Sequence, residues 1–136
     1  MQSIAAGGAH TCVISNSSHV YCWGLGSSGQ LGLASTDNVG DDEVPTSHVV
    51  VGDKVRQVVL GLQHTCALTV EGNLKCWGSN QYGQLGQADL DTTVVLGDDE
   101  NPASLTKYVQ LLADDENDMV SHNVTSMCAG SYHTCV

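Results

Sequence analysis

A block of residues that returns along the chain constrains this sequence more than any other feature. His-Thr-Cys begins at His10, again 54 residues later, and a third time after a further 69. Other landmarks return once in the same order: Cys22-Trp23-Gly24 as Cys76-Trp77-Gly78, Gly29-Gln30-Leu31-Gly32 as Gly83-Gln84-Leu85-Gly86, and Gly40-Asp41-Asp42-Glu43 as Gly97-Asp98-Asp99-Glu100. We interpret this pattern as an internal repeat, because chance does not easily return four landmarks in one order.

The local signals within each repeat predict β-strands. Residues 55–60 are rich in β-branched side chains, and residues 65–70 and 73–77 flank a turn at Glu71-Gly72. In the first repeat the matching strands are 11–15 and 19–23. No segment has a convincing helical periodicity, so the sequence predicts an all-β fold.

The size of the repeat indicates the architecture. One small twisted sheet cannot bury both of its faces, so neighbouring repeats must cover it. Units of about 50 residues with several strands each are typical of a β-propeller blade. We predict a partial propeller of about two and a half repeats: residues 1–54, residues 55–123 with an acidic insertion, and residues 124–136 as the start of a third. A larger chain or neighbouring subunits are expected to complete the ring.

The charge balance excludes several classes of partner. The 136 residues include 15 Asp and Glu but 4 Lys and Arg, a net charge of −11. Binding to nucleic acid or to an anionic membrane surface requires clustered basic residues. No apolar run approaches the ~20 residues of a membrane span. We therefore expect neither nucleic-acid binding nor membrane insertion.

The motifs resemble a known family. Ala-Gly-Gly-Ala-His-Thr-Cys from Ala6, then Tyr21-Cys22-Trp23-Gly24 and Gly-Gln-Leu-Gly, are similar to the regulator of chromosome condensation repeat, and residues 61–86 match it more closely. The resemblance covers essentially the whole chain. It implies blades of a ring that is usually seven-bladed, and the cysteine-containing motifs look like those of secreted or surface members. The family is functionally diverse, so the fold implies no single activity.

The spacing of the cysteines predicts disulfides within hairpins. Cys12 and Cys22 flank one predicted turn, and Cys66 and Cys76 flank the equivalent one. Residues directly opposite in an antiparallel pair lie ~4.5–5.5 Å apart between Cα atoms, which suits a disulfide. We predict the bonds Cys12–Cys22 and Cys66–Cys76. A Cys128–Cys135 bond across the Gly130 turn is a weaker prediction.

A metal site is the alternative interpretation of the same residues. His10 and Cys12 share one face of a strand, and Cys22 would lie close by. These three could supply ligands for zinc. The chain has no Cys-x2-Cys knuckle, and the hairpins already pair the thiols, so disulfides are favoured.

Disulfides indicate an oxidising compartment, so we expect a secreted or cell-surface protein. Two glycosylation sequons agree with this expectation, Asn16-Ser17-Ser18 and Asn123-Val124-Thr125. Asn16 lies at a predicted turn and is the better candidate.

The repeated histidines and tryptophans are interpreted as structural. His10, His64 and His133 occur once per repeat, and an active site rarely does so. Trp23 and Trp77 are expected to anchor a core or a contact between blades. No catalytic arrangement stands out from the spacing, so we expect a non-enzymatic protein without a cofactor.

The acidic loops are candidate calcium ligands. Calcium takes six to eight oxygen ligands, and clustered carboxylates could begin such a shell. The candidates are Asp41, Asp42, Glu43, Asp98, Asp99 and Glu100. Their spacing is not that of an EF-hand, and a solvated loop is the favoured alternative.

Together these features predict an extracellular protein-interaction or structural module. Its expected partners are other proteins or copies of itself, bound through the loops between strands. One alternative is a building block of an extracellular filament, joined through unpaired blade edges. An alternative of another class is a calcium-dependent secreted enzyme domain.

Overall fold

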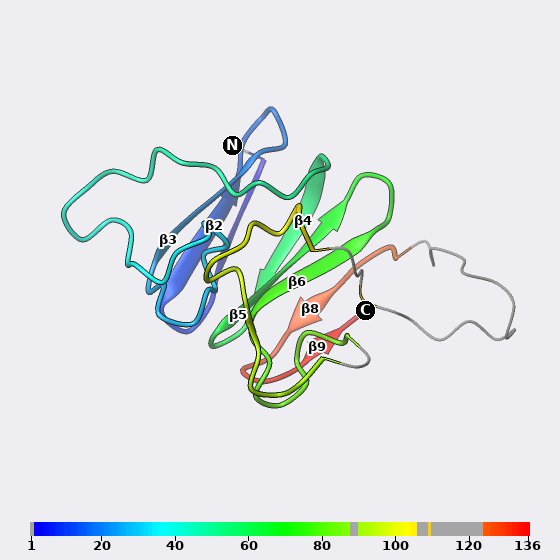
Figure 1. Ribbon diagram of the computed structural model, residues 1–136. Helices are drawn as coiled ribbons and strands as arrows, with labels where there is room; N and C mark the ends of the chain where they lie inside the picture. The colour runs from blue at the N-terminus through cyan, green and yellow to red at the C-terminus, as the bar shows by residue number, and fades with distance from the viewer. Residues whose placement is uncertain (1, 88–89, 106–108, 110–123) are drawn as a thin grey trace, which may run out of the picture.

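The computed structural model describes residues 2–87, 90–105, 109 and 124–136, and this part of the chain contains strands, turns and loops but no helix. Three antiparallel sheets follow one another along the chain (Figure 1). The first consists of β1 (Ser3–Ala6), β2 (His10–Ile14) and β3 (Val20–Gly24). The second consists of β4 (Val55–Leu60), β5 (His64–Thr69), β6 (Leu74–Ser79) and β7 (Val95–Leu96). The third consists of β8 (Cys128–Ala129) and β9 (Thr134–Cys135). The predicted all-β fold is confirmed.

Tight turns set the register of each sheet. The β5–β6 turn has Gly72 at φ 90°, a left-handed conformation that glycine adopts without strain. The equivalent β2–β3 turn has Ser18 at φ 64°. Both turns give the same register, which places Cys12 opposite Cys22 and Cys66 opposite Cys76. Glycine or a short polar residue at the turn therefore determines which side chains face each other across the hairpin.

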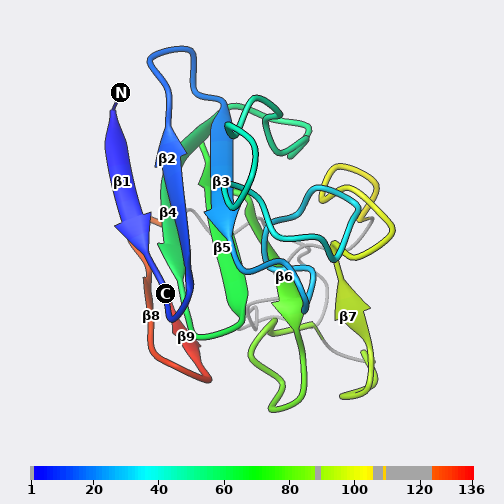
Figure 2. The same cartoon turned by 90° about the vertical axis from the view of Figure 1, so that its left-hand side faces the viewer.

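Adjacent sheets pack face to face in chain order. Strand β4 contacts β1 and β2 of the preceding sheet on one side and β8 of the following sheet on the other. The turns at one end also join: Gly8 N–H donates to the Gly61 carbonyl over 3.1 Å, and Leu62 N–H donates to the Ser131 carbonyl over 3.0 Å. The sheets therefore stack like neighbouring blades (Figures 1 and 2).

The core lies between the first two sheets and within the second. Strands β5 and β6 are buried along their whole length, whereas buried and half-buried residues alternate on β2. Trp77 is the largest fully buried side chain. The Gly-Gln-Leu-Gly segments, which follow β3 and β6, form successive tight turns. Their leucines, Leu31 and Leu85, are fully buried.

Some predictions fall beyond the described residues. The acidic insertion around residues 113–118 and the sequon at Asn123 lie outside them. No helix that could span a membrane occurs in the part of the chain that the structure describes.

Candidate functional site

A hydrogen-bonded joint connects the first repeat to the second. The His10 ring approaches the Thr65 hydroxyl, with 2.9 Å between Nε2 and Oγ1. The Thr65 hydroxyl donates to the Gln30 carbonyl over 2.8 Å, and the Trp77 indole N–H donates to the same carbonyl over 3.1 Å. Because the Thr65 proton points to Gln30, the network assigns the Nε2 proton of His10 to the contact with Thr65. Side chains of two repeats therefore complete one buried network.

The same joint recurs between the second and third repeats. His64 Nε2 lies 3.0 Å from Thr134 Oγ1, and the Thr134 hydroxyl donates to the Gln84 carbonyl over 3.1 Å. The repeated histidine of one unit thus contacts the repeated threonine of the next. The residues that sequence reasoning missed are these threonines and glutamines, although their recurrence in His-Thr-Cys and Gly-Gln-Leu-Gly was the available signal.

The joint holds its histidines in the neutral form. Burial lowers the pKa of His10 to about 4, with a smaller contribution from the nearby His64. Burial likewise lowers the pKa of His64 to about 4, with a smaller contribution from His133. The Nδ1 atoms of His10 and His64 are buried without a hydrogen-bond partner. For His10 a backbone hydrogen bond with His64 opposes this lowering of the pKa, but burial outweighs it, so a second proton on either ring would place a charge in a largely desolvated site.

Glycine makes room for each histidine ring. A Cβ atom at Gly61 would lie 2.0 Å from His64 Cε1, and a Cβ atom at Gly130 would lie 2.1 Å from His133 Cε1. A side chain at either position would displace the ring. The glycine three residues before each histidine therefore belongs to the joint.

The two predicted hairpin disulfides are confirmed. Cys12–Cys22 and Cys66–Cys76 each join strands whose Cα atoms lie 4.1 Å apart, and all four cysteines are buried. No thiolate of Cys12 or Cys22 remains to bind zinc, so the alternative zinc site with His10 is wrong. Asn16 is exposed in the β2–β3 turn, as a glycosylation acceptor must be.

The weaker cysteine prediction is not met, because Cys128 and Cys135 are free and exposed thiols. They nevertheless lie directly opposite each other on β8 and β9. In the first two repeats the cysteine equivalent to Cys135 instead bonds forward, to a cysteine ten residues later. Cys128 takes the position that Ala5 and Val59 occupy in those repeats.

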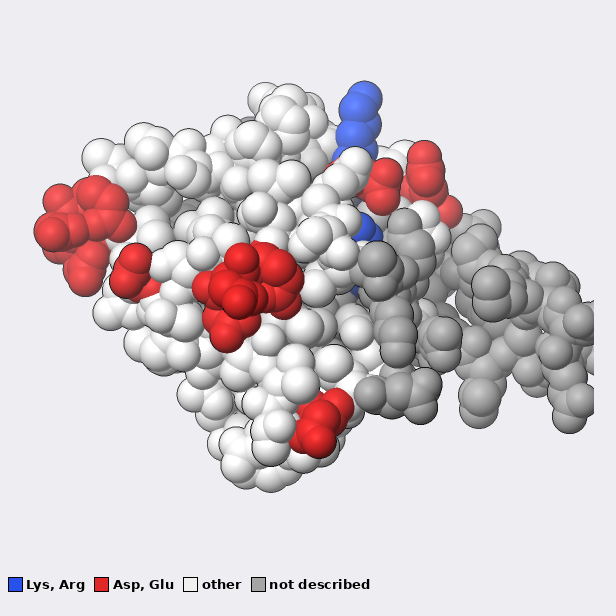
Figure 3. All heavy atoms as spheres, viewed as in Figure 1, with Lys and Arg blue, Asp and Glu red and all other residues white. Residues whose placement is uncertain are grey.

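The acidic loops form two compact clusters of carboxylates on one face (Figure 3). In each cluster one ligand oxygen from every member lies within 4.8 Å of the others, over Asp41, Asp42 and Glu43 and over Asp98, Asp99 and Glu100. Glu43 accepts from Gly40 N–H over 2.9 Å, and Glu100 accepts from Gly97 N–H over 3.0 Å. A hydrogen bond with Asp42 raises the pKa of Glu43, and burial followed by a hydrogen bond with Asp99 raises that of Glu100. Three carboxylates could begin a calcium shell, and calcium binding stays a prediction.

The two acidic loops are held differently. Buried Lys75 on β6 donates to the Val51 carbonyl over 3.0 Å and to the Pro102 carbonyl over 3.2 Å, which ties the second loop to the sheet. The first repeat has Tyr21 at the equivalent position, and its ring lies 6.1 Å from that of His48. There Val44 is 76% exposed beside the first cluster, whereas the equivalent residue of the second loop, Asn101, is polar and half-buried. The first loop therefore projects an apolar side chain next to its carboxylates.

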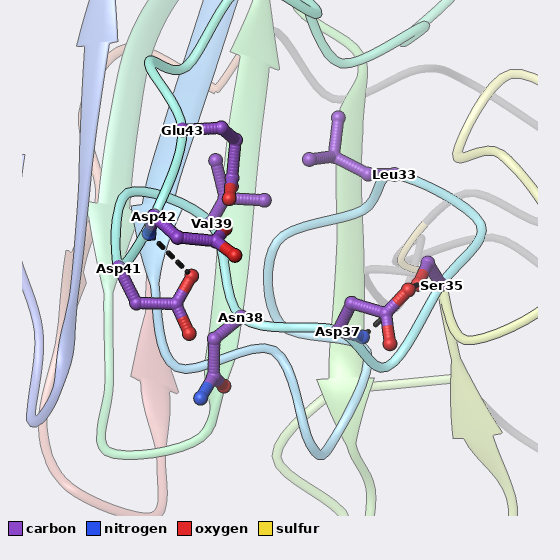
Figure 4. Close-up of a pocket in the computed structure, with 8 residues that line it drawn as sticks. All are labelled: Leu33, Ser35, Asp37, Asn38, Val39, Asp41, Asp42 and Glu43. Carbon is purple, nitrogen blue, oxygen red and sulfur yellow. Dashed lines mark hydrogen bonds between the residues drawn. The ribbon is translucent and has the colours of Figure 1, made fainter.

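A hollow of about 520 Å³ lies beside the first cluster. Figure 4 shows its walls, with Ser35 and Asp37 on one segment and the acidic cluster on the other. The Ser35 hydroxyl donates to Asp37 Oδ2 over 2.8 Å. The residues that line it are Leu33, Ser35, Asp37, Asn38, Val39, Asp41, Asp42 and Glu43. Acidic and half-buried apolar groups thus meet in one open concavity.

Comparisons with known proteins agree with this architecture. A family model described as "Regulator of chromosome condensation (RCC1) repeat" matches residues 17–68 and 71–136, and a second model of the same description matches residues 1–30 and 55–84. The human probable E3 ubiquitin-protein ligase HERC4 is 41% identical over 131 residues, 96% of this chain and 11% of that protein. The ultraviolet-B receptor UVR8 of Arabidopsis thaliana is 33% identical over 96 residues, 70% of this chain and 21% of the receptor.

Solved structures show the same fold. Prp20p of Saccharomyces cerevisiae superposes with a TM-score of 0.63 at 23% identity, over 97% of this chain and 30% of that one. Human WBSCR16 superposes with a TM-score of 0.60 at 25% identity, over 71% of this chain and 23% of that one. The chain therefore spans a fraction of each relative, as a partial propeller does. The chain belongs to the regulator of chromosome condensation (RCC1) repeat family.

Proposed function

We propose that this protein is a non-enzymatic, extracellular protein-binding module of a β-propeller, and that its acidic first-repeat loop forms the binding surface. The observation that carries the proposal is the difference between the two acidic loops. The second loop is tied to the sheet through Lys75, and the first presents Val44 and its carboxylates to solvent. An exposed apolar side chain bordered by charge is typical of a protein-binding surface.

The charge of this surface suggests the chemistry of the partner. A protein surface rich in Lys and Arg would complement the cluster of Asp41, Asp42 and Glu43, and its aliphatic side chains would cover Val44. One propeller of the same fold, yeast RCC1 (Prp20), has been solved bound to Kap60, and its structure is described together with its binding to Gsp1p and histones. That propeller therefore binds proteins, and we extend this property to the present chain.

The disulfides support the extracellular part of the proposal. Both bonds are buried within hairpins, and such bonds persist in oxidising compartments. The proposed partner is accordingly an extracellular or cell-surface protein.

The remaining repeats of the ring are a second class of partner. Thr65 and Trp77 of the second repeat donate hydrogen bonds to the Gln30 carbonyl of the first repeat. Their equivalents Thr11 and Trp23 are half-buried on the outer flank of the first sheet. We propose that a further blade covers this flank in the assembled propeller. A histidine of that blade would contact the Thr11 hydroxyl, and a glutamine carbonyl would accept a hydrogen bond from the Trp23 indole. Filament assembly through the same flank is the alternative.

A pair of matched loop variants tests the binding surface. The protein is immobilised and exposed to extracellular fluid from its source, and captured proteins are cross-linked and quantified by mass spectrometry. We expect a basic protein that is retained by the wild type and by the D98N/D99N/E100Q control. The D41N/D42N/E43Q variant and 0.5 M salt are expected to release it, since salt screens exposed charge. Equal capture by both variants would contradict the proposal.

A further inference from the structure

Two exposed histidines of the first repeat lie against each other beside the β2–β3 turn. His19 follows that turn, and His48 lies in the segment that leads to β4. Their rings stack with 4.7 Å between centroids and 24° between planes. The joint histidines His10 and His64 are buried and contact a threonine hydroxyl, whereas His19 and His48 are open to solvent. Ions in solution can therefore reach this pair of imidazoles.

A backbone bridge brings the two rings together. Val49 N–H donates to the Val20 carbonyl over 2.7 Å, and both valines are buried. Side chains alternate between the two faces of an extended segment, so the neighbours of the buried valines, His19 and His48 among them, face outward. His19 lies diagonal to His48 across this bridge, a separation that ring side chains span. The position of the pair therefore follows from the backbone of the first repeat.

The Ser17 hydroxyl supports one of the two imidazoles as a metal ligand. It lies 3.3 Å from Nδ1 of His19 and 2.9 Å from the Ser15 hydroxyl. When Nδ1 carries the proton and donates to Ser17, and Ser17 donates in turn to Ser15, Nε2 of His19 keeps a free lone pair. Histidines that bind metal ions commonly make such a hydrogen bond through the nitrogen that does not bind the metal. The polar turn thus favours Nε2 as the ligand atom of His19.

The hollow around the two rings suits a transition-metal ion. It has a volume of about 280 Å³, and Asp53 and Lys54 line it with opposite charges. Among the described residues no carboxylate or thiol joins the two rings in a cluster of three ligands, so water would complete the coordination shell. Imidazole nitrogen binds zinc, copper and nickel ions, whereas calcium and magnesium prefer oxygen. The net charge of −11 adds a general attraction for cations.

We propose that His19 and His48 form a binding site for a divalent transition-metal ion. Zinc holds histidine nitrogens at ~2.0–2.1 Å, so a tetrahedral ion requires the two nitrogens to lie ~3.3 Å apart. The exposed rings reach that separation by tilting toward each other about their side-chain bonds. The ion would tie the β2–β3 turn to the segment that follows the first acidic loop. The second repeat lacks the pair, because Asn73 stands at the position of His19.

Equilibrium dialysis of the full chain against zinc, followed by metal analysis of the protein, tests the proposal. Excess magnesium is present to occupy carboxylates. We expect one zinc ion that the wild type binds and that H19N and H48N each bind at least tenfold more weakly. H19N introduces the residue of the second repeat. The D41N/D42N/E43Q variant is the matched control and is expected to keep the wild-type affinity. Zinc binding that persists in both histidine variants, or that the control abolishes, would overturn the proposal.

Nitrogen-15 NMR of the imidazoles gives an independent measurement. Zinc is expected to shift ring nitrogens of His19 and His48 together and to leave those of His10 and His64 unchanged. A zinc-dependent shift confined to one of the two exposed rings would contradict the pairing. Ser17→Ala keeps both rings but removes the hydrogen-bond partner of Nδ1, and we expect zinc to bind ~10-fold more weakly. Unchanged resonances of the two joint histidines in every variant report that the fold is preserved.

Discussion

The first and second repeats carry the same motifs, yet their side chains are buried to different extents. Trp77 is fully buried and bonded to the Gln30 carbonyl, whereas its equivalent Trp23 is half-buried. A Cβ atom at Gly29 would lie 2.7 Å from the Leu96 carbonyl of the next repeat, whereas the equivalent Gly83 has nothing within 4 Å. The motif thus becomes core only where a neighbouring blade supplies the other half of the joint.

The difference in burial shows that the repeated motif has two roles, one within each repeat and one between neighbouring repeats. Within a repeat, turns and disulfides define the hairpin, and both repeats fold alike in this respect. Between repeats, the histidine of one unit and the threonine of the next form a hydrogen-bonded contact in the interface between the two sheets. Stability in such an arrangement is a sum of repeat terms and joint terms. Matched substitutions at equivalent positions isolate the joint terms.

The tryptophans give the largest expected contrast. Trp77→Ala removes a fully buried ring and the donor to the Gln30 carbonyl, and we expect it to lower the free energy of unfolding by ~3–5 kcal/mol. Trp23→Ala is expected to cost about 1–2 kcal/mol, because that side chain is only half-buried. Urea denaturation measures both. Equal losses would show that the joint does not determine the burial of the motif.

Removal of either disulfide is expected to cost the same stability, without the contrast between repeats that the tryptophans give. Cys12–Cys22 and Cys66–Cys76 close loops of the same length, each with a sequence separation of 10. Loss of either bond through a double Cys→Ala substitution is therefore expected to cost ~3 kcal/mol, mainly by freeing the unfolded chain. Thermal denaturation of the two double variants checks this. A much larger loss in the second repeat would show that native packing, rather than loop closure, determines their effect.

The joint hydroxyl gives a smaller contrast. Thr65→Val keeps the shape of the side chain but leaves the His10 Nε2 proton without an acceptor, and we expect a loss of ~1–3 kcal/mol. Thr11→Val, on the outer flank, is expected to stay within ~0.5 kcal/mol. Chemical denaturation with matched m-values provides the comparison. A costly Thr11→Val in the 136-residue chain alone, without the further blade proposed to cover this flank, would contradict the account of the joint.

The sequence predicts the features within each repeat, but not the contacts between repeats. The hairpins, the two disulfides and the propeller fold follow from local turn signals, the spacing of the cysteines and the family motifs. The joint does not, because His10, Thr65 and Gln30 lie far apart in the chain and meet only after two sheets pack. The tether of Lys75 to the Pro102 carbonyl is equally invisible, since a lone lysine on a strand looks like a solvated side chain.

Acid provides the most graded test of the joint. The pKa values of His10 and His64 are about 4 in the folded protein, against about 6.5 unfolded, so the unfolded chain binds more protons in this interval. The contribution of the two neutral histidines to the free energy of unfolding is therefore fully present above pH 6.5. It is lost as the pH drops toward 4, by up to ~1.4 kcal/mol per pH unit for each histidine. Denaturation curves between pH 7 and 4 measure the slope. A H10Q/H64Q variant that kept the full slope would assign it to other groups.

Native-state amide hydrogen exchange tests the central claim most directly, because it reports the local opening of each strand in one experiment. If the joint converts a hairpin into core, the amides of β5 and β6 will exchange far more slowly than the equivalent amides of β2 and β3. Thr65→Val will then reduce the protection of β5 selectively. Equal protection of the two hairpins, unchanged by Thr65→Val, would contradict the claim that the inter-repeat joint determines which copy of the motif becomes core.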